Sequence, residues 1–468
     1  MHSSSLSLDF NSLKRAYADG SWTPSSVIDE VYGRLAHRAG DHVWTHVVPR
    51  EVALAAAARL ERSRAGGSSL PLYGIPFGVK DNIDAAGLPT TAGCPAFGYE
   101  ATQSAVAIER LEAAGAILIG KQSMDQFATG LVGIRSLSGY CRNPFDSRYI
   151  PGGSSSGSAV AVSTGQVSFS IGSDTGGSGR VPAALNNIVG LKPTPGLVSM
   201  RGFVYCNRSF DVAPVFALTV QNAADVLDVI AGSDPTDPFS VDHPSAIAHR
   251  GTTPLRFGVP HAEDLKFFGN DAAHSSYLAS LDVLRSLGAQ EVRIDYKPFV
   301  DAGRLVFGSA FIAERWLTYR DVISRYPDSV HPAVRASIEA AQNYSAADAF
   351  QALYTQRTLT RYAAQLFQTI DFLALPTVPT IYRCDDVERD PQSLNANMGY
   401  YTYFANPLNL AAMSVPAGFT PDGLPFGLSL VGPAFSERAL VSTGRRIEKA
   451  IAGSLGATGL HVAPNQYD

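Results

Sequence analysis

The sequence predicts an α/β/α layered fold in which a central sheet is covered by helices on both faces. The short, wholly apolar run at 116–119 is typical of a buried strand, 167–171 is expected to be another buried strand, and segments with helical character lie between such strands. Strands that are apolar throughout need cover on both faces. At 468 residues, 45% of them hydrophobic, the chain is long enough to bury such a core.

The individual elements follow from local patterns along the chain. Thr23 followed by Pro24 indicates a helix start, and glycine at 115 indicates a helix end. The expected elements are helix over most of 8–64, a strand ending at Lys80, helix 104–115 capped by Ser104, strand 116–119, helix 155–164, strand 167–171, strand 255–259, helix 271–287, strand 290–294, long helices up to 367, strand 371–375, core elements at 407–417 and 427–432, and helix 437–452.

Composition excludes several classes of protein. A net charge of −5 without a dominant basic patch argues against a nucleic-acid partner. The four scattered cysteines indicate reduced thiols rather than a disulfide framework or a structural zinc site. No signal peptide is evident over residues 1–14, and the long uncharged stretches are too rich in Gly, Ser and Pro for a membrane span. We therefore expect a soluble, cytoplasmic protein without a membrane or nucleic-acid partner.

Two glycine- and serine-rich turns and one lysine form the main chemical constellation. The turns cover 152–158 and 172–180, and Lys80 ends an apolar run upstream of both. No histidine occurs between residues 47 and 242, so a Ser-His-Asp triad would need a base from a remote part of the sequence. Burial lowers the pKa of a lysine, and its neutral amine can accept a proton. Ser178 could then be a nucleophile, with Ser154 relaying its proton to Lys80.

Other interpretations of these segments compete with catalysis. Turns rich in Gly and Ser are usually flexible connections, and a lysine at a strand end is usually solvated. A phosphate-binding loop would need Gly-x-x-x-x-Gly-Lys-Ser/Thr, or Gly-x-Gly-x-x-Gly before a suitable acidic residue, and both patterns are absent.

Three longer segments give a more specific signal. Residues 74–82, 151–162 and 172–194 closely resemble the amidase signature family, and the 24-residue spacing between Ser154 and Ser178 also fits that family. The resemblance implies a mixed central sheet and no metal or cofactor. By the same resemblance, Ser178 is the nucleophile, Ser154 is a bridging serine on a cis peptide bond, and Lys80 is the base.

The resemblance also assigns the oxyanion hole and the division of the chain. The backbone amides of Thr175, Gly176, Gly177 and Ser178 would stabilise the oxyanion. The whole of 1–468 is expected to be one amidase domain without a C-terminal accessory domain. Its expected parts are an N-terminal helical segment at 1–70, a catalytic core at 71–232, a surface loop at 233–254 and a remainder with substrate-pocket helices at 255–468.

Within the family, the chain is most similar to the amidase domain of allophanate hydrolases. The likeness includes 77–84, 88–94, 125–131, 178–187 and 415–427. It implies hydrolysis of the terminal amide of allophanate with release of ammonia, in urea or triazine nitrogen use. Relatives are often homodimers, so a homodimer is compatible with the resemblance.

Three residues are predicted to bind the substrate. Arg315 matches the family's substrate-binding arginine, and its guanidinium suits a carboxylate; without the resemblance it would be interpreted as a helix-surface arginine. Gly130 matches a glycine that the family places against the substrate. Phe307 is a departure, because the family has a tyrosine eight residues before this arginine. Loss of that hydroxyl weakens binding or indicates a different substrate.

Four hypotheses therefore remain open from the sequence. The chain is an amidase for allophanate, or an amidase of the same mechanism for another small amide. It could instead be an amidase-like subunit that works only within a larger assembly, as in tRNA-dependent amidotransferases. A scaffold without catalysis is disfavoured, because all three catalytic positions are filled.

Overall fold

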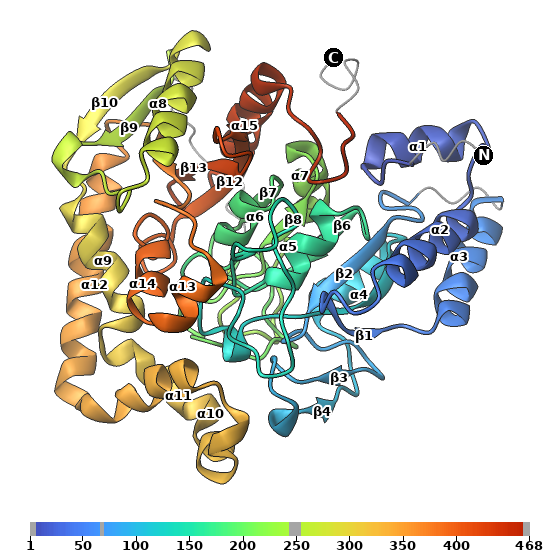
Figure 1. The fold of residues 1–468 in the computed structure, drawn as a ribbon, viewed down its shortest axis with the longest axis horizontal. Helices are drawn as coiled ribbons and strands as arrows, with labels where there is room; N and C mark the ends of the chain where they lie inside the picture. The colour runs from blue at the N-terminus through green and yellow to red at the C-terminus, as the bar shows by residue number, and fades with distance from the viewer. Residues whose placement is uncertain (1–5, 66–69, 243–253, 462–468) are drawn as a thin grey trace.

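The computed structural model describes residues 6–65, 70–242 and 254–461. In this part of the chain, an eleven-stranded mixed sheet has the order β1-β5-β2-β6-β8-β7-β12-β13-β11-β9-β10, and helices cover both of its faces (Figure 1). This confirms the predicted layered α/β fold. The strands are β1 (Trp44–Val47), β2 (Pro76–Lys80), β3 (Pro89–Thr90), β4 (Tyr99–Glu100), β5 (Ile117–Gln122), β6 (Phe169–Ile171), β7 (Val189–Lys192), β8 (Val215–Ala217), β9 (Arg256–Pro260), β10 (Gln290–Ile294), β11 (Phe372–Pro376), β12 (Ala411–Phe419) and β13 (Pro425–Gly432).

The helices follow the predicted distribution along the chain. They are α1 (Phe10–Ala18), α2 (Pro24–His37), α3 (Arg50–Ala65), α4 (Val106–Ala113), α5 (Ser156–Ser163), α6 (Val181–Leu185), α7 (Val220–Ile230), α8 (Asp271–Ser286), α9 (Lys297–Phe307), α10 (Ala313–Arg325), α11 (Pro332–Glu339), α12 (Ala346–Leu366), α13 (Cys384–Arg389), α14 (Ser393–Met398) and α15 (Glu437–Ile451). Short 3₁₀ turns are η1 (Pro95–Phe97), η2 (Gln126–Ala128), η3 (Ala262–Asp264), η4 (Ala310–Ile312), η5 (Pro327–Ser329) and η6 (Ala340–Asn343).

Three parallel strands bring the sequence motifs to one edge of the sheet. Strand β2 pairs in parallel with β5 on one side and with β6 on the other. Its five residues are all buried: four of them belong to the predicted apolar run, and Lys80 is the last. The carboxyl ends of parallel neighbours meet at the same edge. The segments that follow β5 and β6 therefore start beside Lys80.

Helix α5 packs closely on these strands because it is built from very small residues. A Cβ added to Gly157 would lie 2.6 Å from the backbone nitrogen of Ser123, so only glycine fits there. Ser158 donates a hydrogen bond to Oε1 of Gln122 on β5, 3.0 Å away. The helix thereby fixes the turn that precedes it, which contains Ser154.

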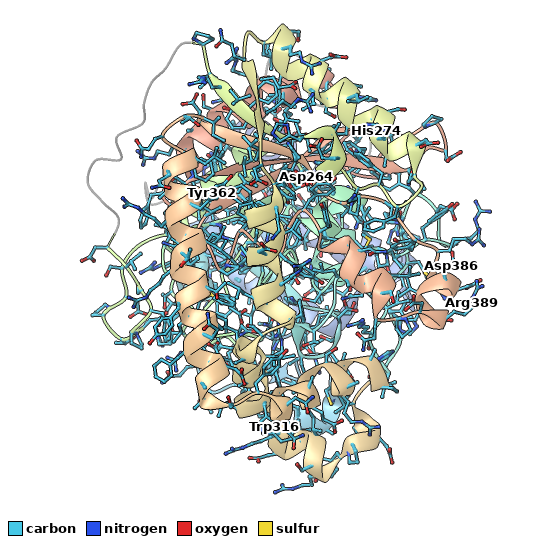
Figure 2. All side chains as sticks on the ribbon, turned by 90° about the vertical axis from the view of Figure 1, so that its left-hand side faces the viewer. Asp264, His274, Trp316, Tyr362, Asp386 and Arg389 are labelled. Carbon is cyan, nitrogen blue, oxygen red and sulfur yellow. The ribbon has the colours of Figure 1, made fainter. Side chains whose placement is uncertain are left out.

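The later helices form the side of the molecule shown in Figure 2. Helices α9 and α12 contact each other there, and the hydroxyl of Tyr362 on α12 donates to the carbonyl of Asp295 just before α9. Trp316 lies on α10 at the end of the molecule away from His274 on α8. Along the chain, α10 follows α9 and η4, and it carries Arg315.

Two local details differ from the sequence expectations. Ser104 is not a helix cap, because α4 begins at Val106 and the Ser104 hydroxyl instead accepts a hydrogen bond from the Ala86 N–H. Strand β1 interrupts the mostly helical N-terminal segment, because it completes the sheet by antiparallel pairing with β5. Of the predicted loop at 233–254, residues 243–253 lie outside the described residues.

Two further features concern the whole fold. All four cysteines are buried and none forms a disulfide. Across the described ranges, the helices are too short or too polar to span a bilayer.

Candidate active site

Lys80 is fully buried and makes three polar contacts, all with uncharged oxygen atoms. Its Nζ lies 2.7 Å from Oγ of Ser154, 2.9 Å from Oγ of Ser173 and 3.2 Å from the Ser173 carbonyl. Asn82 donates to the same Ser173 hydroxyl at 3.0 Å. A neutral amine keeps two N–H groups for Ser173 and has a lone pair for Ser154.

The protonation of Lys80 is governed mainly by burial. Removal from water lowers the pKa of its amine from 10.5 to about 8, and Coulombic interactions with Cys206 and Asp211 partly offset the shift. A substantial fraction of this lysine is therefore neutral near neutral to mildly alkaline pH. Such a pKa suits a general base.

Ser154 connects Lys80 to Ser178. The Ser154 hydroxyl lies 2.9 Å from Oγ of Ser178, and both side chains are almost completely buried. The peptide bond between Gly153 and Ser154 is cis. A hydroxyl can donate and accept, so the contacts allow a proton to pass from Ser178 through Ser154 to a neutral Lys80.

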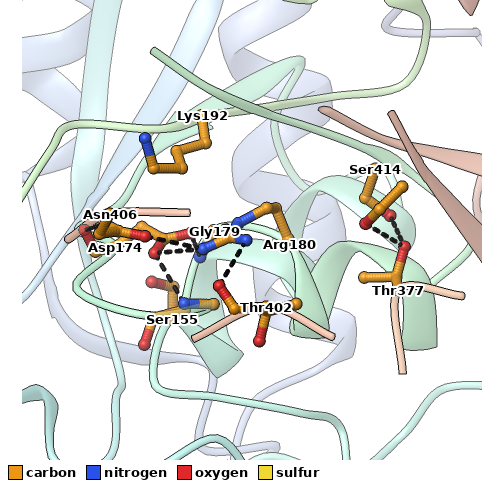
Figure 3. A network of polar contacts seen from close by, with 12 residues as sticks. Ser155, Asp174, Gly179, Arg180, Lys192, Thr377, Thr402, Asn406 and Ser414 are labelled. Atoms are coloured by element: carbon orange, nitrogen blue, oxygen red, sulfur yellow. Dashed lines mark hydrogen bonds and ion pairs between the residues drawn. The ribbon is translucent and has the colours of Figure 1, made fainter. Parts of the chain in front are cut away.

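A buried carboxylate holds the turn that carries Ser178 (Figure 3). Asp174 accepts the backbone N–H groups of Gly177 at 2.7 Å and Gly179 at 2.9 Å, the residues on either side of the serine. Arg180 donates to both oxygens of Asp174 at 3.0 Å. The guanidinium also donates to the Thr402 carbonyl at 2.9 Å. The position of Ser178 is thus set by charge-assisted hydrogen bonds.

The backbone amides of this turn only partly match the predicted oxyanion hole. Gly177 differs from the expectation, because its N–H is already bound to Asp174. The N–H groups of Thr175, Gly176 and Ser178 have no acceptor among the described residues. Three of the four predicted donors are therefore without an acceptor in the described part of the chain.

Asp211 supports the same turn from a distant part of the chain. Its buried carboxylate accepts hydrogen bonds from the Thr175 hydroxyl and from the backbone N–H of Cys206 at 2.7 Å. Burial raises the pKa of Asp211 to about 6. No sequence motif drew attention to Asp211, because only the fold brings it to the turn.

Arg315 is fully buried, so the interpretation as a surface arginine is wrong. Its Nε lies 3.1 Å from the Cys206 sulfur and its Nη1 lies 2.9 Å from the Val306 carbonyl. Its Nη2 is buried without a hydrogen-bond partner among the described residues. The guanidinium carbon lies 4.3 Å from the centroid of the Phe307 ring. An uncommitted donor on a buried cation is a feature of an anion-binding site.

Gly130 and Arg315 each contact a residue that also lies against the segments carrying Ser154 or Ser178. A Cβ on Gly130 would lie 2.6 Å from Oδ2 of Asp125, and the Asp125 backbone N–H donates to the Ser154 carbonyl. Val306, whose carbonyl accepts a hydrogen bond from Arg315, lies beside Gly176: a Cβ added to Gly176 would meet the side chains of Val306 and Tyr403. The structure therefore brings the predicted residues into one region.

Several residues of this region had no role in the sequence analysis. Asp174, Arg180 and Ser173 stand inside the quoted 172–180 motif, so charge and hydroxyl groups within that motif were the available signal. Tyr403 had no such signal. Over the described ranges, no group of three or more His, Cys, Asp or Glu is placed to hold a metal ion.

Comparisons with known proteins identify the family of this chain. A family model described as Amidase matches residues 27–441. The urea amidolyase of Lachancea kluyveri is 39% identical over 412 residues, which are 87% of this chain and 22% of that protein. A glutamyl-tRNA(Gln) amidotransferase subunit from Chloroflexus aggregans is 34% identical over 461 residues, covering 92% of this chain and 93% of that protein. A solved variant of Kluyveromyces lactis allophanate hydrolase has a TM-score of 0.90 at 34% identity and covers 99% of this chain and 76% of that one.

The fold and these similarities define the class of protein to which this chain belongs. The chain belongs to the amidase family, whose model covers most of its length. It spans about a fifth of the urea amidolyase that it matches, 22% of that protein's length.

Proposed function

We propose that this protein is a serine amidohydrolase that cleaves the amide of a small carboxylated substrate, with allophanate as the preferred substrate, and releases ammonia. The observation that carries the proposal is the continuous set of contacts from Lys80 through Ser154 to Ser178, at 2.7 and 2.9 Å. These contacts end on a serine in a turn where the N–H groups of Thr175, Gly176 and Ser178 have no acceptor among the described residues.

In the proposed reaction, Ser178 attacks the amide carbonyl carbon. Its proton passes to Ser154 while the Ser154 proton passes to the neutral amine of Lys80. The oxyanion is stabilised by the N–H groups of Thr175, Gly176 and Ser178. The proton returns by the same route to the leaving nitrogen, and ammonia departs. Water then hydrolyses the acyl-enzyme with the same relay, which restores the Ser178 hydroxyl.

The preference for a carboxylated substrate comes from Arg315. Its buried guanidinium has one unpartnered nitrogen, and its contacts with Cys206 and Val306 leave its charge without a directly bonded carboxylate in the described structure. A substrate carboxylate would supply that partner. The similarity to proteins named urea amidolyase and allophanate hydrolase supports allophanate in particular.

A steady-state ammonia assay with the isolated protein tests this proposal. The panel contains allophanate, malonamate, which is a small amide with a carboxylate, and propionamide, which has none. We expect kcat/KM to be higher for the two carboxylated amides. Equal values for propionamide, or no turnover of any carboxylated amide, would contradict the proposal.

A second candidate is the same chemistry on a different small amide. Phe307 favours it, because the ring below Arg315 contributes no hydroxyl to a substrate carboxylate. A preference for an uncharged amide in the same assay would select this candidate. Inactivity towards every free amide, together with co-purification of a second protein, would instead select a role within an amidotransferase-like assembly. The similarity to the Chloroflexus aggregans amidotransferase protein supports that interpretation.

A further inference from the structure

Tyr403 lies directly on the turn that carries the proposed nucleophile. A Cβ added to Gly176 would lie 2.8 Å from Cδ1 of Tyr403, and one added to Gly399 would lie 2.0 Å from its Cε2. The ring is therefore seated between two positions where only glycine fits. Tyr403 is partly exposed, whereas Thr402 and Phe404 on either side of it are buried.

The same ring adjoins the buried cation. The rings of Tyr403 and Phe307 pack with centroids 5.1 Å apart, and the guanidinium of Arg315 lies over the Phe307 ring. Phe307 offers no polar group to a ligand at this point. The ring that packs against Phe307 belongs to Tyr403, and it carries a phenol hydroxyl.

The Tyr403 hydroxyl has little else to bind. Among the described residues, its acceptor is the Asn395 carbonyl at 3.5 Å, which is at the limit for a hydrogen bond. Tyr400 and Tyr401, in the same segment, donate to carbonyl groups at 2.8 and 3.1 Å. Burial raises the pKa of Tyr403, so its hydroxyl stays protonated and can donate.

We propose that Tyr403 is a specificity-determining residue whose hydroxyl donates a hydrogen bond to the carboxylate of the substrate held by Arg315. This inference rests on the proposed function, since it assumes a carboxylated amide in the site. Tyr403 would recognise the charged end of the substrate, while Ser178 reacts with the amide end.

The experiment compares the wild type with Tyr403→Phe, which removes one oxygen and keeps the ring on Gly176. Malonamate and propionamide are the substrates, and malonate is a competing ligand that needs no turnover. We expect the variant to raise the KM for malonamate and the Ki of malonate by about 10- to 100-fold, as for loss of a hydrogen bond to a charged group. Its kcat for malonamate and its KM for propionamide should change by less than about threefold. Tyr400→Phe is the matched control and should leave all of these values unchanged.

The outcomes separate this inference from the proposed function. An unchanged KM and Ki in Tyr403→Phe, with an active wild type, would overturn the role of Tyr403 alone. An equal loss of kcat on malonamate and propionamide would also overturn it, because the hydroxyl would then support the Ser178 turn rather than the carboxylate. A wild type that hydrolyses propionamide but no carboxylated amide would overturn both proposals.

Discussion

Asp174 and Arg180 form a two-point ion pair whose side chains are both completely buried, with each guanidinium nitrogen 3.0 Å from its carboxylate oxygen. The same carboxylate binds the backbone on both sides of Ser178. The pair therefore connects the stability of the fold to the position of the proposed nucleophile.

Replacing Asp174 with Asn should destabilise the protein and slow the reaction. An amide cannot accept hydrogen bonds at both of its ends, so the buried Arg180 charge loses part of its partner. We expect a loss of about 3–5 kcal/mol in the free energy of unfolding, measured by urea denaturation, together with a lower kcat. Asp146→Asn is the control, because Asp146 pairs with an exposed arginine, Arg148, and solvent-exposed ion pairs contribute little to stability. Equal stability of the two variants would contradict this role.

The proposed relay predicts a large loss of kcat when any of its three members is replaced by alanine. Ser178→Ala and Lys80→Ala should each lower kcat by about 10⁴-fold or more, and Ser154→Ala should lower it severely, because the groups act as a unit. Circular dichroism should show a retained fold in each variant. Ser280→Ala is the control, because that buried serine on α8 hydrogen-bonds to the carbonyl of Ser276 in its own helix rather than to the relay. Activity close to the wild type in Ser178→Ala would remove the nucleophile assignment.

The pKa of Lys80 predicts the direction of the pH dependence. The neutral amine is the reactive form, and its pKa is lowered to about 8 by burial. The kcat/KM should therefore rise with pH up to about 8 and level off above it, falling about tenfold per pH unit on the acid side. Near-UV circular dichroism over the same range separates this effect from unfolding, since burial also lowers the pKa of Lys192, to about 7. A flat profile between about pH 6 and 9 would be inconsistent with Lys80 as the base.

The sequence predicted those parts of the fold that depend on local patterns. The apolar run before Lys80 marked β2, the apolar run at 116–119 marked the start of β5, and a run of very small residues marked α5. Strand β1 is four residues long, with alternating burial, and exists because it pairs with β5. Such pairing depends on contacts between distant segments, which a single sequence does not display.

The same distinction holds within the candidate site. Lys80, Ser154 and Ser178 stand in long, specific motifs, and the structure places them in contact. Asp211 stands in no quoted motif and reaches Thr175 only through the fold. The occupied amide of Gly177 was equally hidden, because its acceptor is a side chain three residues away whose orientation depends on Arg180.

The role proposed for Arg315 predicts that its loss weakens the binding of carboxylated substrates in particular. Arg315→Ala should raise the KM for malonamate and allophanate by about 10- to 100-fold with a smaller effect on kcat, because a charge-assisted hydrogen bond contributes about 1.5–3 kcal/mol. The KM for propionamide should stay close to the wild-type value, since that substrate has no carboxylate. Arg320→Ala is the control on the same helix, where the side chain is 54% exposed. An unchanged KM for malonamate in Arg315→Ala would mean that the carboxylate binds elsewhere. An equal increase for propionamide would mean that Arg315 shapes the pocket rather than recognising charge.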